Sequence, residues 1–209
     1  MSQSRKSTFT NIDEKKILTL GETSVGKSSF IGYFIDKKFS YNYLPTLGFD
    51  FKAKKINLPN GKNVKLKVFD TAGQERFKSM SLNHLKQIDG VLLIYDITNE
   101  ESFKNISKWM NDIRQSRDKT LPIVLCGNKC DLEDKRVISK EMGEKKAEEN
   151  DISFIETSCK EGINIDEAFM ELVKLIYNKS EENENRDTVQ INRESFKSKN
   201  VNKGKSSCC

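Results

Sequence analysis

The sequence is poor in the residues that mark secreted, metal-binding and membrane-spanning proteins. It has a single histidine, His84, and its five cysteines are odd in number and lack the spacing of a disulfide framework. Cys126 and Cys130 are followed by no second pair of ligands, which disfavours a zinc site. The longest apolar run, Val91–Tyr95, is far shorter than the ~18–20 residues of a membrane span, and residues 1–16 lack the apolar stretch of a secretory signal. These absences predict a protein of a reducing compartment.

The charge is nearly balanced, and the composition changes near the end of the chain. The formal net charge of +5 is too small to predict nucleic-acid binding. Residues 180–209 hold few large apolar residues and no periodicity, and their lysines gather near the end. We therefore expect a flexible N-terminal extension over residues 1–15, one folded domain over 16–178 and a disordered tail with a basic end over 179–209.

Hydrophobic patterning predicts a sandwich of strands and helices. Short apolar runs predict buried strands, and apolar residues at helical spacing lie between them. The predicted strands are Ile17–Leu20, Val91–Tyr95, Ile123–Cys126 and Ile152–Ile155. Phe49–Leu58 and Val64–Asp70 alternate around the turn Pro59-Asn60-Gly61 and predict a hairpin. The expected fold is an α/β three-layer sandwich, with a six-stranded, mostly parallel sheet, one antiparallel hairpin strand and about five flanking helices.

A glycine-rich segment carries the signature of a phosphate-binding loop. Gly21-Glu-Thr-Ser-Val-Gly26-Lys27-Ser28 matches G-x-x-x-x-G-K-[ST], follows a predicted strand and opens a helix. Glycine allows the backbone to wrap phosphates, whose charge meets N–H groups at the helix N-terminus. Lys27 would neutralise the β- and γ-phosphates, and the Ser28 hydroxyl would bind Mg²⁺. The other predicted nucleotide-binding residues of this segment are Thr23, Ser24, Val25 and Ser29.

A second segment, Asn128-Lys129-Cys130-Asp131, favours guanine over adenine. It follows a predicted buried strand, where open α/β sheets bind ligands. The Asp131 carboxylate can accept hydrogen bonds from the ring N–H and the exocyclic amine of guanine together. Adenine lacks that amine and would leave the carboxylate unpaired, which discriminates by roughly 10⁴-fold or more. An ATP-dependent P-loop enzyme is therefore strongly disfavoured.

With these motifs the chain resembles the Rab branch of the Ras-superfamily small GTPases, without pointing to one Rab subfamily. Asp70–Glu75 and Glu156–Lys160 complete the superfamily's motif set, and the resemblance covers about residues 15–178. Segments that resemble diagnostic Rab stretches are Leu47–Phe51, Lys65–Phe69, Arg76–Met80 and Leu93–Thr98. Other branches fit less well. Residue 2 is Ser rather than the Gly of myristoylated Arf proteins, the stretch from Asp131 to Ser139 is too short for the Rho insert, and the chain ends in Cys-Cys.

The resemblance implies the P-loop NTPase fold and a set of catalytic and metal-binding residues. Thr46 would bind Mg²⁺ through its hydroxyl and contact the γ-phosphate through its backbone, and Asp70 would hold Mg²⁺ through water. Gly73 would donate its backbone N–H to the γ-phosphate, and Gln74 would orient the attacking water. The implied catalytic residues are Gln74, Lys27 and Thr46, and the implied metal ligands are Ser28, Thr46 and Asp70.

Around the base, the resemblance places Phe39 edgewise on the guanine and the stem of Lys129 over it. The backbone of Ser158, Cys159 and Lys160 would support the base. Cys159 replaces the usual alanine; a redox role is the less favoured alternative to a tolerated small thiol. Trp109 belongs to a helical apolar stripe and is expected to be core packing.

The resemblance also implies a membrane anchor and a set of partners. Cys208 and Cys209 would carry two geranylgeranyl groups, which together anchor stably, and the preceding lysines would add attraction to an anionic surface. Phe51, Phe69 and His84 match the aromatic triad that contacts effectors; as alternatives, His84 is a pH sensor or a plain exposed residue. Implied partners are an exchange factor, a GTPase-activating protein, a GDP dissociation inhibitor, a Rab escort protein and effectors.

The expected activity is slow GTP hydrolysis, because no arginine in these motifs is placed to supply transition-state charge. We expect a monomer that binds no nucleic acid and regulates vesicle-mediated transport from the cytoplasmic face of an intracellular or plasma membrane, with a cytosolic pool. The alternative is a nucleotide-binding scaffold without significant hydrolysis.

Overall fold

The structure, a computed structural model, describes residues 12–39, 49–71, 85, 87–116 and 120–181. The chain divides into two compact units, Met1–Leu172 and Val173–Cys209. Everything that follows on the sheet and its site belongs to the first unit. In the second unit the described residues, 173–181, are helical. No helix within the described residues is long and apolar enough to cross a membrane.

A six-stranded sheet forms the centre of the first unit, which confirms the predicted fold class. The strands are β1 (Asp13–Leu20), β2 (Phe49–Asn57), β3 (Asn63–Thr71), β4 (Gly90–Asp96), β5 (Ile123–Asn128) and β6 (Ser153–Thr157). Their order in the sheet is β2-β3-β1-β4-β5-β6. Only β2 among these strands runs antiparallel to its neighbour, β3, and the four other pairs are parallel. The parallel strands therefore share one edge at their C-terminal ends.

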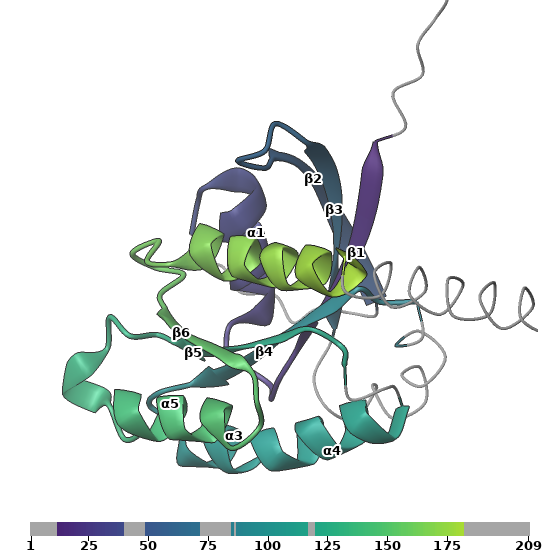
Figure 1. The fold of residues 1–209 in the computed structure, drawn as a ribbon. Helices are drawn as coiled ribbons and strands as arrows, with labels where there is room; N and C mark the ends of the chain where they lie inside the picture. Colours follow the sequence, from purple (N-terminus) through teal and green to yellow (C-terminus); the bar gives the residue numbers. More distant parts are fainter. Residues whose placement is uncertain (1–11, 40–48, 72–84, 86, 117–119, 182–209) are drawn as a thin grey trace, which may run out of the picture. The chain divides into compact units, whose positions relative to one another are not determined.

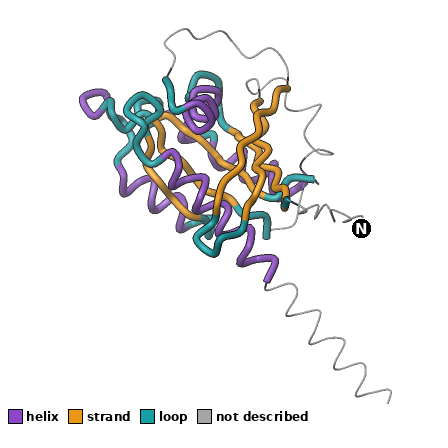
Figure 2. Tube along the Cα trace, turned by 90° about the horizontal axis from the view of Figure 1, so that it is seen from above, coloured by secondary structure: helices purple, strands orange, loops and turns teal. Residues whose placement is uncertain are grey.

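Helices cover both faces of the sheet, as Figures 1 and 2 show. The named helices are α1 (Lys27–Asp36), α3 (Glu100–Lys104), α4 (Ile106–Ser116) and α5 (Lys140–Glu148), with a 3₁₀ turn, η2 (Glu133–Lys135). Residues 165–172 are also helical. On the α1 face, Phe34 stacks on Phe169 with ring centroids 3.7 Å apart. This arrangement is the three-layer sandwich that the sequence predicts.

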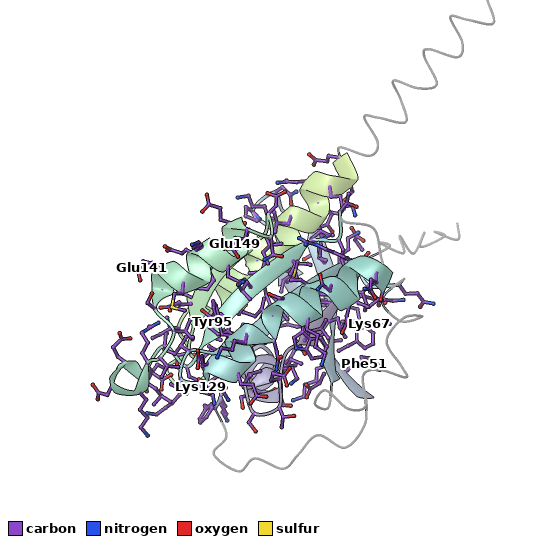
Figure 3. The ribbon with its side chains drawn as sticks, turned by 90° about the horizontal axis from the view of Figure 1, so that it is seen from below. Phe51, Lys67, Tyr95, Lys129, Glu141 and Glu149 are labelled. Carbon is purple, nitrogen blue, oxygen red and sulfur yellow. The ribbon has the colours of Figure 1, made fainter. Side chains whose placement is uncertain are left out.

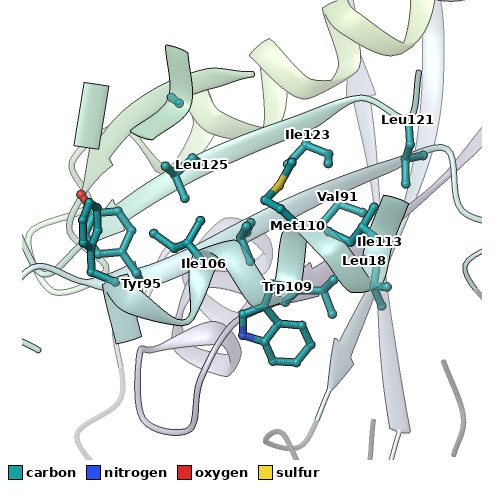
Figure 4. Packing of buried hydrophobic residues seen from close by; sticks show 14 of the residues in the cluster. Leu18, Val91, Tyr95, Ile106, Trp109, Met110, Ile113, Leu121, Ile123 and Leu125 are labelled. Atoms are coloured by element: carbon teal, nitrogen blue, oxygen red, sulfur yellow. The ribbon is translucent and has the colours of Figure 1, made fainter. Parts of the chain in front are cut away.

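The core on the opposite face is built around the apolar stripe of α4. Ile106, Trp109, Met110 and Ile113 recur at helical spacing and pack with residues of β1, β4 and β5 (Figure 4). Every residue of β4 is buried, which explains its continuous apolar run. The core fixes β4 and β5 tightly, and so fixes the residues at their ends.

The first strand begins earlier than expected. We predicted a flexible extension over residues 1–15, whereas β1 starts at Asp13. Asp13 pairs with Val64, and the Glu14 carboxylate lies 2.7 Å from the ammonium of Lys67. This part of the strand is held by backbone pairing and ion pairs, which a search for apolar runs does not detect.

The predicted hairpin is confirmed, with small shifts at its ends. The Gly61 N–H donates to the Leu58 carbonyl, and Gly61 has a positive φ of 79°, a conformation that favours glycine. β2 and β3 are paired from Phe49 and Thr71 at one end to Asn57 and Asn63 at the other.

Candidate nucleotide-binding site

The predicted phosphate loop joins β1 to α1 at the C-terminal edge of the sheet (Figure 1). Its two glycines are required by their surroundings. A Cβ on Gly21 would lie 2.0 Å from the carbonyl oxygen of Ile94, and a Cβ on Gly26 would lie 2.5 Å from Asn128 Nδ2. Both glycines have φ values in the left-handed region, 141° and 101°. The loop is thus folded tightly against β4 and β5, with its backbone close to both.

The start of α1 is suited to an anion. The first turn of α1, all of which is described, contains no acidic residue, and Gly26 at its N-cap gives no side-chain cap. The first N–H groups of a helix have no intrahelical partner, and the helix dipole adds positive potential there. Val25 is buried under the loop, Ser28 and Ser29 are half-buried, and Thr23 and Ser24 are exposed. The residues predicted to bind phosphate are therefore gathered at one helix terminus.

Lys27 is buried beneath this loop. Its side-chain Nζ donates to the carbonyl oxygens of Gly21 at 2.9 Å and Glu22 at 2.6 Å. Burial lowers the pKa of Lys27 to about 8, and the carboxylates of Asp70 and Glu22 act in the opposite direction. A phosphate group would favour the charged form further. The ammonium is thus held where the loop would enclose phosphates.

The residues around Lys27 fit a magnesium ion. Ser28 follows Lys27 directly, and the charge of Asp70 at the end of β3 acts on Lys27. A hydroxyl and a carboxylate are the hard oxygen donors that Mg²⁺ prefers. The third predicted ligand, Thr46, lies outside the described residues, as do Gly73 and Gln74.

Asn128 connects the predicted base-binding segment to the phosphate loop. Its side chain is at the buried end of β5, and Nδ2 donates to the carbonyl oxygen of Val25 at 2.7 Å. Its Oδ1 accepts from the Thr157 hydroxyl at 3.3 Å and the Cys159 thiol at 3.4 Å. One amide therefore joins the end of β5 to the phosphate loop, 103 positions away at Val25, and to the end of β6 with the residues after it.

Lys129 and Asp131 are also held by named partners. Lys129 has a positive φ of 68°, and its Nζ donates to the Ser24 carbonyl oxygen at 2.9 Å. Asp131 Oδ1 accepts from the Ser158 hydroxyl at 2.5 Å. The hydrogen bond from Ser158 fixes the Asp131 carboxylate at the C-terminal edge of the sheet, where the sequence analysis predicts that guanine binds.

Cys159 is a buried thiol rather than a reactive thiolate. It is 4% exposed, and burial raises its pKa to about 12. Lys160 beside it is exposed and lies 3.5 Å from Glu161. The thiol therefore packs between the base-binding segment and the phosphate loop.

The predicted base contact Phe39 and the predicted effector residues Phe51 and Phe69 lie outside the phosphate loop and the base-binding segment. Phe39 is half-buried just after α1. Phe51 and Phe69 are cross-strand neighbours whose ring centroids are 5.8 Å apart, and the Lys67 ammonium lies 5.8 Å from the Phe51 ring (Figure 3). Phe51 is half exposed, at 51%. His84, Cys208 and Cys209 lie outside the described residues.

Sequence reasoning missed two residues that contact the site. Asp96, at the end of β4, forms an ion pair with Lys129, and Trp109 on α4 donates a hydrogen bond to Glu22 of the phosphate loop. The position of Asp96 directly after a buried strand could have indicated it, because ligands bind at strand ends. No sequence signal separates the Trp109 N–H from ordinary core packing.

A loop with the phosphate-binding sequence before a helix, joined to the predicted base-binding segment at the same sheet edge, is the arrangement of a P-loop nucleotide-binding protein. Residues 16–178 match the family model described as "Ras family". The chain belongs to this family and is a Rab-type small GTPase of the Ras superfamily.

Similar proteins share most of their length with this chain. It is 44% identical over 177 residues to Ras-related protein Rab-10 of Diplobatis ommata, covering 84% of this chain and 88% of that one. It is 43% identical over 165 residues to Rab-13 of Bos taurus, covering 79% and 81%. It is 42% identical over 164 residues to Rab-8B of Pongo abelii, covering 78% and 79%.

Proposed function

We propose that the chain is a switch that binds GTP and GDP with Mg²⁺, hydrolyses GTP slowly, and regulates vesicle-mediated transport from a membrane. One observation carries the proposal. Asn128 joins the base-selecting segment to the phosphate loop at 2.7 Å, so that a base and its phosphates can be held by one rigid frame. In this frame Asp131 selects guanine, and Ser158 holds its carboxylate in place.

The chain's own residues supply positioning and charge for hydrolysis. Lys27 exchanges its carbonyl partners for the β- and γ-phosphates, and Gln74 orients the water that attacks the γ-phosphorus. Ser28, Thr46 and Asp70 would hold Mg²⁺, which when bound offsets the charge of the phosphate oxygens. No arginine in these motifs is placed to supply charge to the transition state. An activating protein that lends one accelerates such reactions by about 10³–10⁵-fold.

Loss of the γ-phosphate changes the state of the switch. In the GTP state, Thr46 and Gly73 contact the γ-phosphate; hydrolysis removes those contacts, and the segments that contain them relax. Effectors that recognise the GTP state then dissociate, with Phe51, Phe69 and His84 as their contact surface. An exchange factor restores GTP, and a GDP dissociation inhibitor and an escort protein handle the lipid-bearing form.

The last two cysteines would anchor this switch. Two geranylgeranyl thioethers on Cys208 and Cys209 give stable attachment, where one chain gives marginal binding. Each lysine of the tail near an anionic surface would add about 1 kcal/mol. The anchor places the domain on the cytoplasmic face of an intracellular or plasma membrane.

The identity of the bound nucleotide and the rate of its hydrolysis test the proposed switch. The full chain is purified, its nucleotide is extracted and identified, and single-turnover hydrolysis is measured for the parent and for Gln74→Leu. We expect bound GDP and slow hydrolysis in the parent, and slower hydrolysis in the variant. Retained GTP with no hydrolysis in the parent would favour the non-hydrolysing scaffold, and bound adenine nucleotide would overturn the assignment of the base.

Membrane fractionation tests the anchor separately. A chain that lacks Cys208 and Cys209 should move to the cytosol of the host cell, while its nucleotide binding stays that of the parent. Persistent association with membranes would refute lipid attachment as the main anchor. The single replacements Cys208→Ser and Cys209→Ser show whether both positions are needed.

A further inference from the structure

A tryptophan far along the chain holds a side chain of the phosphate loop. Trp109 Nε1 donates to Glu22 Oε1 at 3.2 Å, across a separation of 87 residues. Trp109 is 6% exposed, and Figure 4 shows its ring beside the other side chains of the α4 stripe. A ring packed in the core presents its N–H from a fixed position, and an indole can only donate. The Glu22 carboxylate is therefore tied to the core through α4.

Glu22 is also connected to Lys27. Its backbone carbonyl accepts from Lys27 Nζ at 2.6 Å, so Glu22 and the Lys27 ammonium are in direct contact through the main chain. A carboxylate in a phosphate loop carries the same sign of charge as the phosphates and can compete with them for the ammonium. The remaining positions between Gly21 and Gly26 are neutral, so Glu22 alone brings this conflict into the loop.

We propose that Trp109 is a positioning residue for nucleotide binding: its indole N–H holds the Glu22 carboxylate at α4, which leaves Lys27 available to the phosphates. The inference rests on the proposed guanine-nucleotide binding and assigns a role to a residue outside every nucleotide-binding motif of the chain. Trp109 acts through Glu22, and not on the nucleotide itself.

A positioning role for Trp109 can be distinguished from plain core packing because only the positioning role depends on the charge of Glu22. If Trp109 only fills space, removing its N–H lowers stability, and the charge of Glu22 does not matter. If Trp109 restrains the carboxylate, removing the N–H weakens nucleotide binding, and neutralising Glu22 restores it. Trp109→Phe keeps an aromatic ring without the donor. Glu22→Gln keeps an Oε1 acceptor without the charge.

The test follows release of a fluorescent GDP analogue from the full chain into excess GDP, with Mg²⁺ and at constant pH. Trp109→Phe should release the analogue about tenfold faster, the size expected for a lost hydrogen bond to a charged group. Glu22→Gln should release it no faster than the parent. The double variant should return to within about threefold of the parent, because the two changes are coupled.

Met110→Leu is the matched control, since Met110 lies beside Trp109 on the same stripe and is 2% exposed. Its release rate should match the parent, and thermal unfolding of all variants shows that they are folded. If Trp109→Phe released the analogue at the parent's rate, or if the double variant released it as fast as Trp109→Phe, the role of Trp109 would be overturned and the proposed function would still stand. A parent chain that does not bind the analogue would overturn the proposed function, and this inference with it.

Discussion

Lys129 and Asp96 form an ion pair across the ends of two neighbouring strands, with Nζ 2.5 Å from Oδ2. Asp96 ends β4 and is paired in register with Asn128, the last residue of β5. The other carboxylate oxygen of Asp96 accepts from the backbone N–H and the hydroxyl of Thr98 at 2.8 and 2.7 Å. Both oxygens of the carboxylate are thus used, and the Lys129 side chain is fixed between Asp96 and the carbonyl of Ser24.

Replacing Asp96 by Asn should weaken both nucleotide binding and the stability of the fold. The amide can still accept from Thr98, but it no longer pairs with Lys129, whose stem is expected to lie over the base. We expect nucleotide release to become about tenfold faster and the free energy of unfolding to fall by about 1–3 kcal/mol, measured by urea denaturation. Glu100→Gln is the control, because its ion pair with Lys104 is exposed on both sides. Equal effects of the two variants would contradict the role of Asp96.

Asp131→Asn should move base preference away from guanine. The amide cannot accept two hydrogen bonds from the ring N–H and the exocyclic amine of guanine, and its own N–H₂ group faces those donors. We expect GTP affinity to fall by about 10³-fold or more and xanthine nucleotide affinity to rise, as measured in a competition assay with both nucleotides. Ser158→Ala removes the 2.5 Å hydrogen bond to Asp131 while keeping the carboxylate, so it should reduce affinity without changing preference. Unchanged GTP affinity in Asp131→Asn would refute the base contact.

Alanine substitutions at two glycines with positive φ distinguish backbone strain alone from backbone strain combined with a steric clash. Gly26 and Gly61 have φ values of 101° and 79°, but a Cβ at Gly26 would meet Asn128 Nδ2, whereas a Cβ at Gly61 has nothing within 4 Å. Gly61→Ala should therefore lower stability by about 1 kcal/mol and leave nucleotide binding intact. Gly26→Ala should also break the contact between Asn128 and Val25 and abolish measurable nucleotide binding. Calorimetry with GDP distinguishes them, and equal binding by both variants would contradict the described packing.

The sequence predicted the fold well because its signals are local and repeated. The buried run of β4 and the stripe of α4 each follow from a single period, and the hairpin follows from Gly61 in its turn. The early start of β1 at Asp13 was missed, because charged residues form that part of the strand.

The residues of the candidate site could be predicted from the sequence only where they belong to a short motif. Lys27 and Asn128 come from short patterns with a known chemical purpose, and the structure brings both to one sheet edge. Asp96 and Trp109 act through tertiary contacts with Lys129 and Glu22, and such contacts appear only once distant segments are packed together.

Cys159 should be inert to alkylation in the folded chain. Burial raises the pKa of Cys159 to about 12, so at pH 9 the folded chain keeps almost all of this side chain as thiol, whereas an unfolded chain holds far more of it as thiolate. The folded state keeps this proton between pH 9 and 12. The stability that Cys159 contributes is therefore complete below pH 9 and falls as the pH rises through that window.

Iodoacetamide labelling at pH 9, located by mass spectrometry, measures this directly. Cys159 in the folded, nucleotide-bound chain should react at least about 100-fold more slowly than in urea, because both ionisation and access are suppressed. Cys130, which is half-buried, is the internal comparison and should react faster. If Cys159 reacted as fast in the folded chain as in urea, its thiol would be activated rather than packed. A redox role between the base-binding segment and the phosphate loop would then replace the packing role.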